Sequence, residues 1–260
     1  MLLNAKVAGT GPDIILLHGL FGSLENLGRI ASLLSEHYTV HALDQRNHGR
    51  SPHADVMNYP VMAQDVLSYM DHAKLASACV LGHSMGGKVA MTLAMQAPER
   101  VNGLIIADIA PVQYPPHHDE IFSALKSLDL AAIKNRQDAN AHLQSFGIHP
   151  EIVPFLLKNL TLDKSAGFQW RINLPVIERD YPHLMTAISS ANAFKRPVMF
   201  IAGGLSDYVR KEHEPAIRTL FPAFEFKVIE GTSHWLHAEK PETFAGICRR
   251  FLQKIPAMQN

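Results

Sequence analysis

The sequence predicts an α/β protein: a mainly parallel twisted sheet with helices on both faces. The first observation is that short apolar, β-prone runs alternate along the chain with stretches of helical apolar spacing, as in strands joined by helical crossovers. The second is that this alternation breaks between about residues 112 and 194, where helical patterns occur without a convincing strand. We therefore expect a sheet-based core with an inserted helical cap.

The strand candidates are short and apolar. Ile14 to Leu17 is apolar at all four positions and stops at His18-Gly19, as strands buried on both faces do. Runs of the same kind follow at 39–43, 78–81, 103–107, 197–201 and 226–229. Helical apolar spacing connects several of them, at 24–34, 62–70, 85–95 and 241–252.

The interrupted region has helical patterns at 121–130 and 152–160. Pro115-Pro116 marks its start, and Pro197 begins the returning strand. Because open α/β sheets bind ligands at the carboxyl ends of their strands, we place the cap over that edge. The expected domains are a core of residues 1–111 and 195–260 and a helical cap of residues 112–194.

Composition argues against several classes of protein. The 260 residues include 24 Lys+Arg and 24 Asp+Glu, so no net charge attracts nucleic acid or an anionic membrane surface. No apolar run approaches the ~18 residues of a membrane span, and the first residues lack the pattern of a signal peptide. We expect a cytoplasmic monomer or small homo-oligomer, with Cys79 and Cys248 as buried free thiols.

Gly82-His83-Ser84-Met85-Gly86 matches the G-x-S-x-G pattern. It lies between a strand candidate and a helix candidate, where a sharp turn would push the Ser84 hydroxyl clear of the backbone. The helix amino terminus would add partial positive charge beside it. Ser84 is therefore the candidate nucleophile; the alternative is a glycine-rich turn with an incidental serine.

A serine nucleophile needs a base within hydrogen-bond reach. His234 follows the last strand candidate, in a loop that should lie at the same sheet edge as Ser84. A neutral imidazole there would accept the serine proton and return it to the leaving group. His237 lies on the same segment, but a third ligand for a metal is not evident, so we expect no metal.

The chain carries four distinctive motifs: HGLFG (18–22), DQRNHGRS (44–51), GHSMGG (82–87) and GTSH (231–234). Together they resemble the α/β-hydrolase superfamily across nearly the whole chain. Finer features are LFGSLENLG (20–28), MNYPVMAQD (57–65), GHSMGGK (82–88), DIAPVQY (108–114) and HWLHAEKP (234–241). These resemble the YbfF-type bacterial esterases, and a mitochondrial human abhydrolase-domain protein is similar more distantly.

The resemblance implies a serine hydrolase that acts on short-chain esters or acyl thioesters without a cofactor. It also implies that the backbone N–H groups of Leu20 and Met85 form the oxyanion hole, with Phe21 as a second choice for Leu20. His18 would brace its loop rather than react. Asp44, Arg46 and His48 would likewise fix loops through hydrogen bonds.

A carboxylate should orient His234. The usual superfamily position, in a GxxD pattern after the penultimate strand, is occupied by Ser206 in an ungapped reading, and Asp207 comes one residue late. Asp108 ends the strand after the nucleophile helix, a position that some superfamily members use for the acid. We favour Asp108, keep Asp207 as the alternative acid and regard Ser206 as a possible auxiliary group.

Apolar residues near these groups are candidates for an acyl pocket. They are Phe21, Met85, Phe155, Leu156, Trp170, Ile172 and Trp235. Lys195-Arg196 and Arg210-Lys211 are basic pairs, but neither is a dense cluster for the phosphates of a coenzyme A thioester. Thioester preference therefore rests on the resemblance alone.

Two other kinds of function remain open at this point. Serine-dependent carbon–carbon hydrolases and cofactor-free haloperoxidases keep the same fold and nucleophile. A non-catalytic binding protein on a hydrolase scaffold would have lost one or more of the three catalytic groups. In this sequence the serine, the histidine and an acid are all present. The sequence therefore favours a small-molecule ester or thioester as the partner.

Overall fold

The computed structural model describes residues 1–163, 165 and 167–259. Seven strands form the central sheet: β1 (Ala5–Ala8), β2 (Asp13–Leu17), β3 (Thr39–Leu43), β4 (Ala78–His83), β5 (Val101–Ala107), β8 (Val198–Gly203) and β9 (Phe224–Ile229). Their order is β1-β3-β2-β4-β5-β8-β9, and β1 is antiparallel to β3, whereas the other neighbouring pairs are parallel. The predicted α/β fold with a mainly parallel sheet is confirmed.

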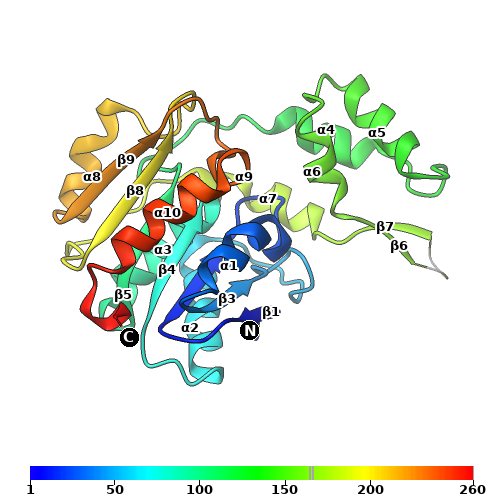
Figure 1. Ribbon diagram of the computed structural model, residues 1–260. Helices are drawn as coiled ribbons and strands as arrows, with labels where there is room; N and C mark the ends of the chain where they lie inside the picture. Colours follow the sequence, from blue (N-terminus) through cyan, green and yellow to red (C-terminus); the bar gives the residue numbers. More distant parts are fainter. Residues whose placement is uncertain (164, 166, 260) are drawn as a thin grey trace.

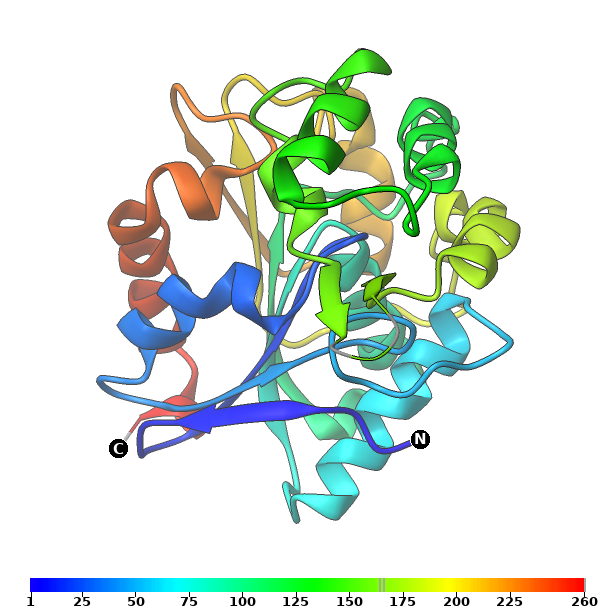
Figure 2. The same ribbon diagram turned by 90° about the vertical axis from the view of Figure 1, so that its right-hand side faces the viewer.

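Helices cover both faces of this sheet (Figures 1 and 2). One face carries α1 (Gly28–Leu34) and α10 (Pro241–Leu252), which pack against each other. The other carries α2 (Tyr59–His72), α3 (Met85–Gln96) and α8 (Glu214–Leu220). Side chains alternate along a strand, so β2 directs Ile15 and Leu17 to the face covered by α2, α3 and α8. It directs Ile14 and Leu16 to the face covered by α1 and α10.

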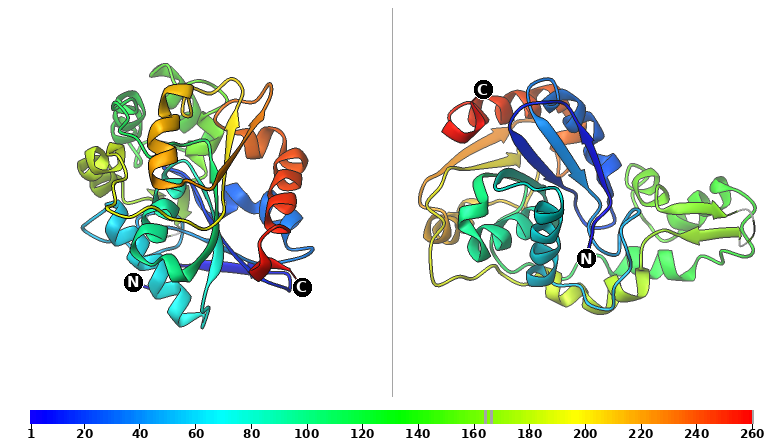
Figure 3. Two further views of the ribbon diagram at one scale, coloured as in Figure 1. Left: turned by 90° about the vertical axis from the view of Figure 1, so that its left-hand side faces the viewer. Right: turned by 90° about the horizontal axis from the view of Figure 1, so that it is seen from below.

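Residues 112–194 form a segment that projects from the sheet (Figures 1 and 3). It contains α4 (Asp119–Ser127), α5 (Arg136–Ser145), α6 (Val153–Leu157) and α7 (Leu174–Met185). It also contains an antiparallel pair, β6 (Leu160–Asp163) and β7 (Gly167–Trp170), which helical spacing did not predict. In the described residues the central sheet takes no strand from this segment. The division into core and cap domains stays a prediction.

The helical predictions at 62–70, 85–95 and 241–252 fall within α2, α3 and α10. The helix predicted at 24–34 is divided in the structure into a 3₁₀ helix at 24–27 and α1, which begins at Gly28. The remaining short elements are η1 (Leu24–Leu27), η2 (Pro98–Arg100), η3 (Lys211–His213), η4 (Pro256–Met258) and α9 (Leu236–Glu239).

Cys79 and Cys248 are both buried free thiols, as expected. Both belong to the apolar cluster between the sheet and the α1/α10 layer, where they pack as small apolar groups. Within the described part of the chain, none of the helices has the length and apolar character needed to cross a membrane.

Candidate active site

The candidate nucleophile lies on a strained turn between β4 and α3. Ser84 has φ 53° and ψ −120°, a conformation that costs a residue with a side chain about 1–3 kcal/mol. The surrounding glycines permit this turn. A Cβ on Gly82 would lie 2.2 Å from the Gly86 carbonyl oxygen, and one on Gly86 would lie 2.2 Å from the Leu17 carbonyl oxygen. The turn therefore requires both glycines and holds the serine at the end of the strand.

The structure brings His234 and Asp108 together. Asp108 follows β5 and is fully buried, and its Oδ2 lies 2.7 Å from Nδ1 of His234, in the loop after β9. The Gly203 N–H donates to Asp108 Oδ1 at 3.0 Å, and the Ser206 hydroxyl donates to Asp108 Oδ2. Because a carboxylate accepts hydrogen bonds, His234 carries its proton on Nδ1, and Nε2 is the nitrogen that keeps a lone pair.

Asp207 takes no part in this arrangement. Its side chain is exposed, and its backbone carbonyl accepts a hydrogen bond from Arg210. Among the hydrogen bonds and ion pairs of the described residues, none joins Asp207 to His234. The geometry therefore favours Asp108 over the alternative acid, and Ser206 contacts the candidate acid directly.

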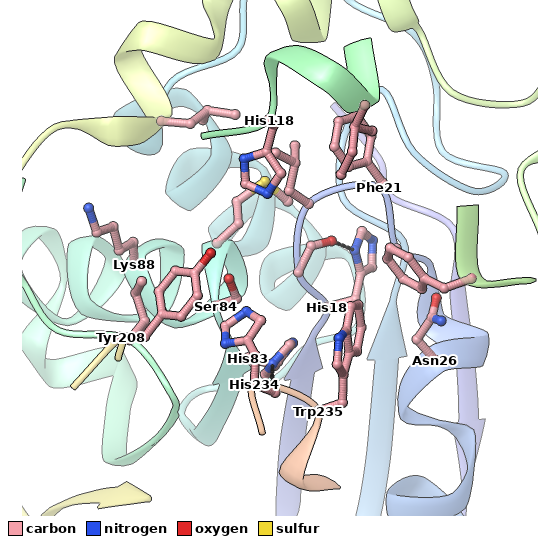
Figure 4. Close-up of a pocket in the computed structure, with 18 of the residues that line it drawn as sticks. His18, Phe21, Asn26, His83, Ser84, Lys88, His118, Tyr208, His234 and Trp235 are labelled. Atoms are coloured by element: carbon pink, nitrogen blue, oxygen red, sulfur yellow. Dashed lines mark hydrogen bonds between the residues drawn. The ribbon is translucent and has the colours of Figure 1, made fainter. Parts of the chain in front are cut away.

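Aromatic rings enclose His234 on two sides. The Tyr208 ring stacks on it with a centroid distance of 4.0 Å, and the Tyr208 hydroxyl is hydrogen-bonded to Nε2 of His117. The His83 ring lies 4.7 Å away, and its Nε2 donates to the His234 carbonyl oxygen at 2.9 Å. Figure 4 shows Ser84, His83 and His234 grouped at the floor of the pocket. These contacts restrict the ring orientation of the candidate base.

Two backbone N–H groups near Ser84 are the candidate oxyanion donors. Met85 is the first residue of α3, so its N–H has no acceptor within the helix. In the other loop, the Phe21 N–H is already bonded to Nε2 of His48 at 3.1 Å. Leu20, which lines the cavity, is therefore the better candidate for the second donor.

The two histidines beside this loop are buried and neutral. Burial lowers the pKa of His48 to about 3, and it also lowers the pKa of His18. His18 accepts from the Gln45 N–H at 3.0 Å, and its Nδ1 donates to the Gly19 carbonyl at 2.8 Å. Both rings therefore brace the candidate oxyanion loop, as the sequence predicted for them.

The remaining predicted loop-fixing residues make the expected kinds of contact. Asp44 accepts hydrogen bonds from the backbone N–H groups of Leu24, at 2.7 Å, and Arg50, at 2.8 Å. Arg46 forms a two-point contact with Asp65, with one nitrogen–oxygen distance of 2.5 Å and another of 2.9 Å. These contacts explain the DQRNHGRS motif as a structural brace.

A cavity of about 290 Å³ opens above Ser84. Two of the predicted pocket residues, Trp170 and Ile172, are not among the described residues that line this cavity. The Trp170 indole N–H instead donates to the Leu125 carbonyl at 3.1 Å, and Ile172 is buried in the core. The predicted residues that do line it are Phe21, Met85, Phe155, Leu156 and Trp235.

Sequence reasoning missed several polar residues of this cavity. Lys88 and His118 lie in its wall, as do Tyr208 and His117 (Figure 4 labels the first three). Burial lowers the pKa of His118 to about 3 and that of Lys88 to about 7. The only signal for Lys88 was its place one helical turn after Ser84; no pattern pointed to the others.

The basic pairs lie apart from the cavity lining. Arg196 donates to the Val101 carbonyl at 3.1 Å, at the amino end of β5, opposite the edge that carries Ser84. Arg210 follows Tyr208 in the chain but is exposed and paired with Glu212 at 3.1 Å. In the described part of the chain, no three or more His, Cys, Asp or Glu side chains are grouped so as to hold a metal ion.

The mainly parallel sheet, the serine on its strand-to-helix turn and the neighbouring His–Asp pair define the α/β-hydrolase class of protein. A family model described as "alpha/beta hydrolase fold" matches residues 12–241. The chain therefore belongs to the α/β hydrolase family, and the predicted resemblance is confirmed.

Particular relatives are also similar over most of their length. "Esterase YbfF" of Escherichia coli (strain K12) is 40% identical over 240 residues, which cover 92% of each chain. The "sn-1-specific diacylglycerol lipase ABHD11" of Mus musculus is 35% identical over 251 residues, covering 94% of this chain and 81% of the relative. A solved structure named "Marine microorganism esterase" has a TM-score of 0.94 and 37% identity, covering 96% of this chain and 99% of its own.

Proposed function

We propose that this protein is a serine esterase that hydrolyses carboxylic esters with short- to medium-chain acyl groups through an acyl-enzyme on Ser84. The observation that carries the proposal is the 2.7 Å contact between His234 and Asp108 beside a serine that projects into a cavity. The esterase and lipase names of the relatives support the same reaction class.

The reaction proceeds in two halves. His234 Nε2 takes the Ser84 proton as the oxygen attacks the ester carbonyl, and the tetrahedral intermediate then collapses. The C–O bond to the alcohol breaks, and the imidazolium gives its proton to the leaving oxygen. In the second half, His234 takes a proton from water and the hydroxide attacks the acyl-enzyme carbonyl. The bond from the acyl carbon to Ser84 Oγ then breaks, the imidazolium returns its proton to Oγ, and the acid is released.

Asp108 orients His234 and stabilises its cation, while Ser206 and the Gly203 N–H hold the carboxylate. The Leu20 and Met85 N–H groups stabilise the oxyanion. A donor of this kind contributes about 10²–10³-fold to the rate.

The cavity favours a small, mainly apolar acyl group. Its volume of about 290 Å³ is near the lower end of the range of about 300–1,000 Å³ for small-molecule sites. Phe21, Phe155 and Trp235 supply aromatic surface for it. Neither basic pair lines it, so an ester is favoured over a coenzyme A thioester.

Hydrolysis of p-nitrophenyl esters from acetate to palmitate tests the proposal. We expect turnover with a chain-length optimum among the short to medium acyl groups, and none with Ser84→Ala protein purified in parallel. Turnover that persists in Ser84→Ala would exclude this nucleophile. If the wild-type protein hydrolyses no ester of the series, the esterase proposal fails and a serine-dependent carbon–carbon hydrolase becomes the alternative.

A further inference from the structure

Lys88 is a buried amine on the nucleophile helix. It lies four residues after Ser84, so one helical turn separates them, and the whole residue is 1% exposed. Figure 4 shows its ammonium group directed away from Ser84. Among the described residues, no ion pair includes it. Catalysis as proposed above does not use this group.

The ammonium group lies where the inserted segment leaves and rejoins the core. We call residues 111–114 and 185–188 the neck. Two backbone hydrogen bonds join its halves: the Tyr114 N–H donates to the Met185 carbonyl at 2.9 Å, and the Ile188 N–H donates to the Pro111 carbonyl at 3.0 Å. The neck is therefore a short paired ribbon that connects the sheet to residues 115–184.

Lys88 bonds to both halves of this ribbon. Its Nζ donates to the Val112 carbonyl at 2.8 Å and to the Thr186 carbonyl at 2.6 Å. The Tyr114 ring from the neck and the Tyr59 ring from α2 lie 4.8 and 5.6 Å from the same nitrogen. One side chain thus ties the outgoing and returning connections to the helix that carries Ser84.

Burial of this amine is unfavourable in itself. It lowers the pKa of Lys88 to about 7, because the charged form has lost most of its water. A methionine would fill similar space without that penalty, so packing alone does not account for a lysine here. What the amine adds is a set of hydrogen bonds to two neck carbonyls.

We propose that Lys88 is a positioning residue that fixes the inserted segment over Ser84 and thereby sets which acyl chains the cavity accepts. The proposal rests on the proposed esterase function for its kinetic readout. Ile121, Phe155 and Leu156 reach the cavity from the inserted segment. A shift of the neck would move these residues relative to Ser84, whereas α3 and the triad would stay on the core.

Lys88→Met tests this inference, with Lys195→Met as the control because Lys195 is exposed and lies outside the two stretches of the neck. For a hexanoate ester we expect KM to rise about tenfold in Lys88→Met, the equivalent of about 1.4 kcal/mol. For an acetate ester, which reaches few residues of the inserted segment, the rise in KM should be at least about fivefold smaller than for the hexanoate ester. Equal effects on the two esters, or no effect on either, would overturn the proposal.

Amide hydrogen exchange gives a readout that does not depend on activity. In Lys88→Met, the Tyr114 and Ile188 amides should exchange at least about tenfold faster, while β4 amides should not change. If the exchange rates of the neck amides did not change in Lys88→Met, the inference about Lys88 would be wrong. This holds even if the Ser84→Ala experiment supports the esterase proposal. If Lys88→Met does not fold, the wild type decides: neck amides must be as protected as those of α3, and rapid exchange there would exclude a fixed neck.

Discussion

Ser84 and Asp108, at the centre of the candidate site, both have a positive backbone φ angle. Ser84 has φ 53° and Asp108 has φ 51°, both in the left-handed region that disfavours residues with side chains. The register explains their proximity, since His83 at the end of β4 pairs with Ala107 at the end of β5. The Ser84 N–H donates to the Ala107 carbonyl, and the Asp108 N–H to the Ile201 carbonyl. Neighbouring strand ends therefore hold both strained residues in place.

Substitution of each candidate acid separates their roles. Asp108→Asn should lower kcat about 10³–10⁴-fold, because a neutral amide does not stabilise the imidazolium and favours the wrong tautomer of His234. The kcat of Asp207→Asn should stay within about threefold of the wild-type value, because the Asp207 side chain is exposed. Steady-state kinetics on one ester measures both. If Asp207→Asn lost much of its kcat and Asp108→Asn lost little, Asp207 would be the acid that orients His234.

At the scale of elements, the turn from β4 to α3 depends on close contact with β2. A Cβ on Gly86 would lie 2.2 Å from the Leu17 carbonyl oxygen and 2.7 Å from the His18 carbonyl oxygen, and both are backbone atoms. Among the described residues, and apart from its chain neighbours and the backbone of its own helix, no atom lies within 4 Å of a Cβ on Gly28, which has φ −59° at the start of α1. These two glycines form a matched pair for substitution.

Gly86→Ala should displace the turn and lower both stability and activity. We expect a loss of about 1–3 kcal/mol in the free energy of unfolding, as for other overpacked sites, and at least about a hundredfold loss of kcat/KM. Gly28→Ala should leave activity unchanged and add about 0.4–1 kcal/mol of stability. Urea unfolding and ester kinetics measure both variants. Wild-type activity in Gly86→Ala would show that the turn tolerates displacement.

The elements that sequence reasoning found are those with continuous apolar patterns, such as β2, β4 and α10. It missed α7 because Pro175 and Pro182 break the helical pattern, although Pro182 lies inside the helix. It missed α5 because only Ala139 and Leu143 of its ten residues are buried, which leaves little apolar periodicity.

The candidate site shows the same division. Ser84, His234 and Asp108 could be predicted because short motifs place them at strand ends. Tyr208 and Lys88 could not. A tyrosine in a loop and a lysine in a helix are most often exposed. Here the Lys88 ammonium bonds to Val112 and Thr186, and the Tyr208 hydroxyl bonds to His117, all in the inserted segment.

At the scale of the whole molecule, several of the 15 histidines are structural rather than titrating groups. Burial lowers the pKa of His48, His118 and His237 to about 3. It also lowers the pKa of His18 and His83. The folded protein thus holds five neutral rings around the cavity and the candidate oxyanion loop.

These lowered pKa values make folding sensitive to acid. Below the ordinary value of 6.5 the unfolded chain binds protons that the folded protein does not, so the stabilising contribution is complete above pH 6.5 and is lost as pH falls toward about 3. Each such histidine adds up to about 1.4 kcal/mol per pH unit to the slope of the unfolding free energy against pH.

Urea unfolding between about pH 8 and about pH 5 measures this slope. His237→Gln should reduce the acid slope by about one proton. A flat profile in the wild type would mean that these rings gain protons without unfolding.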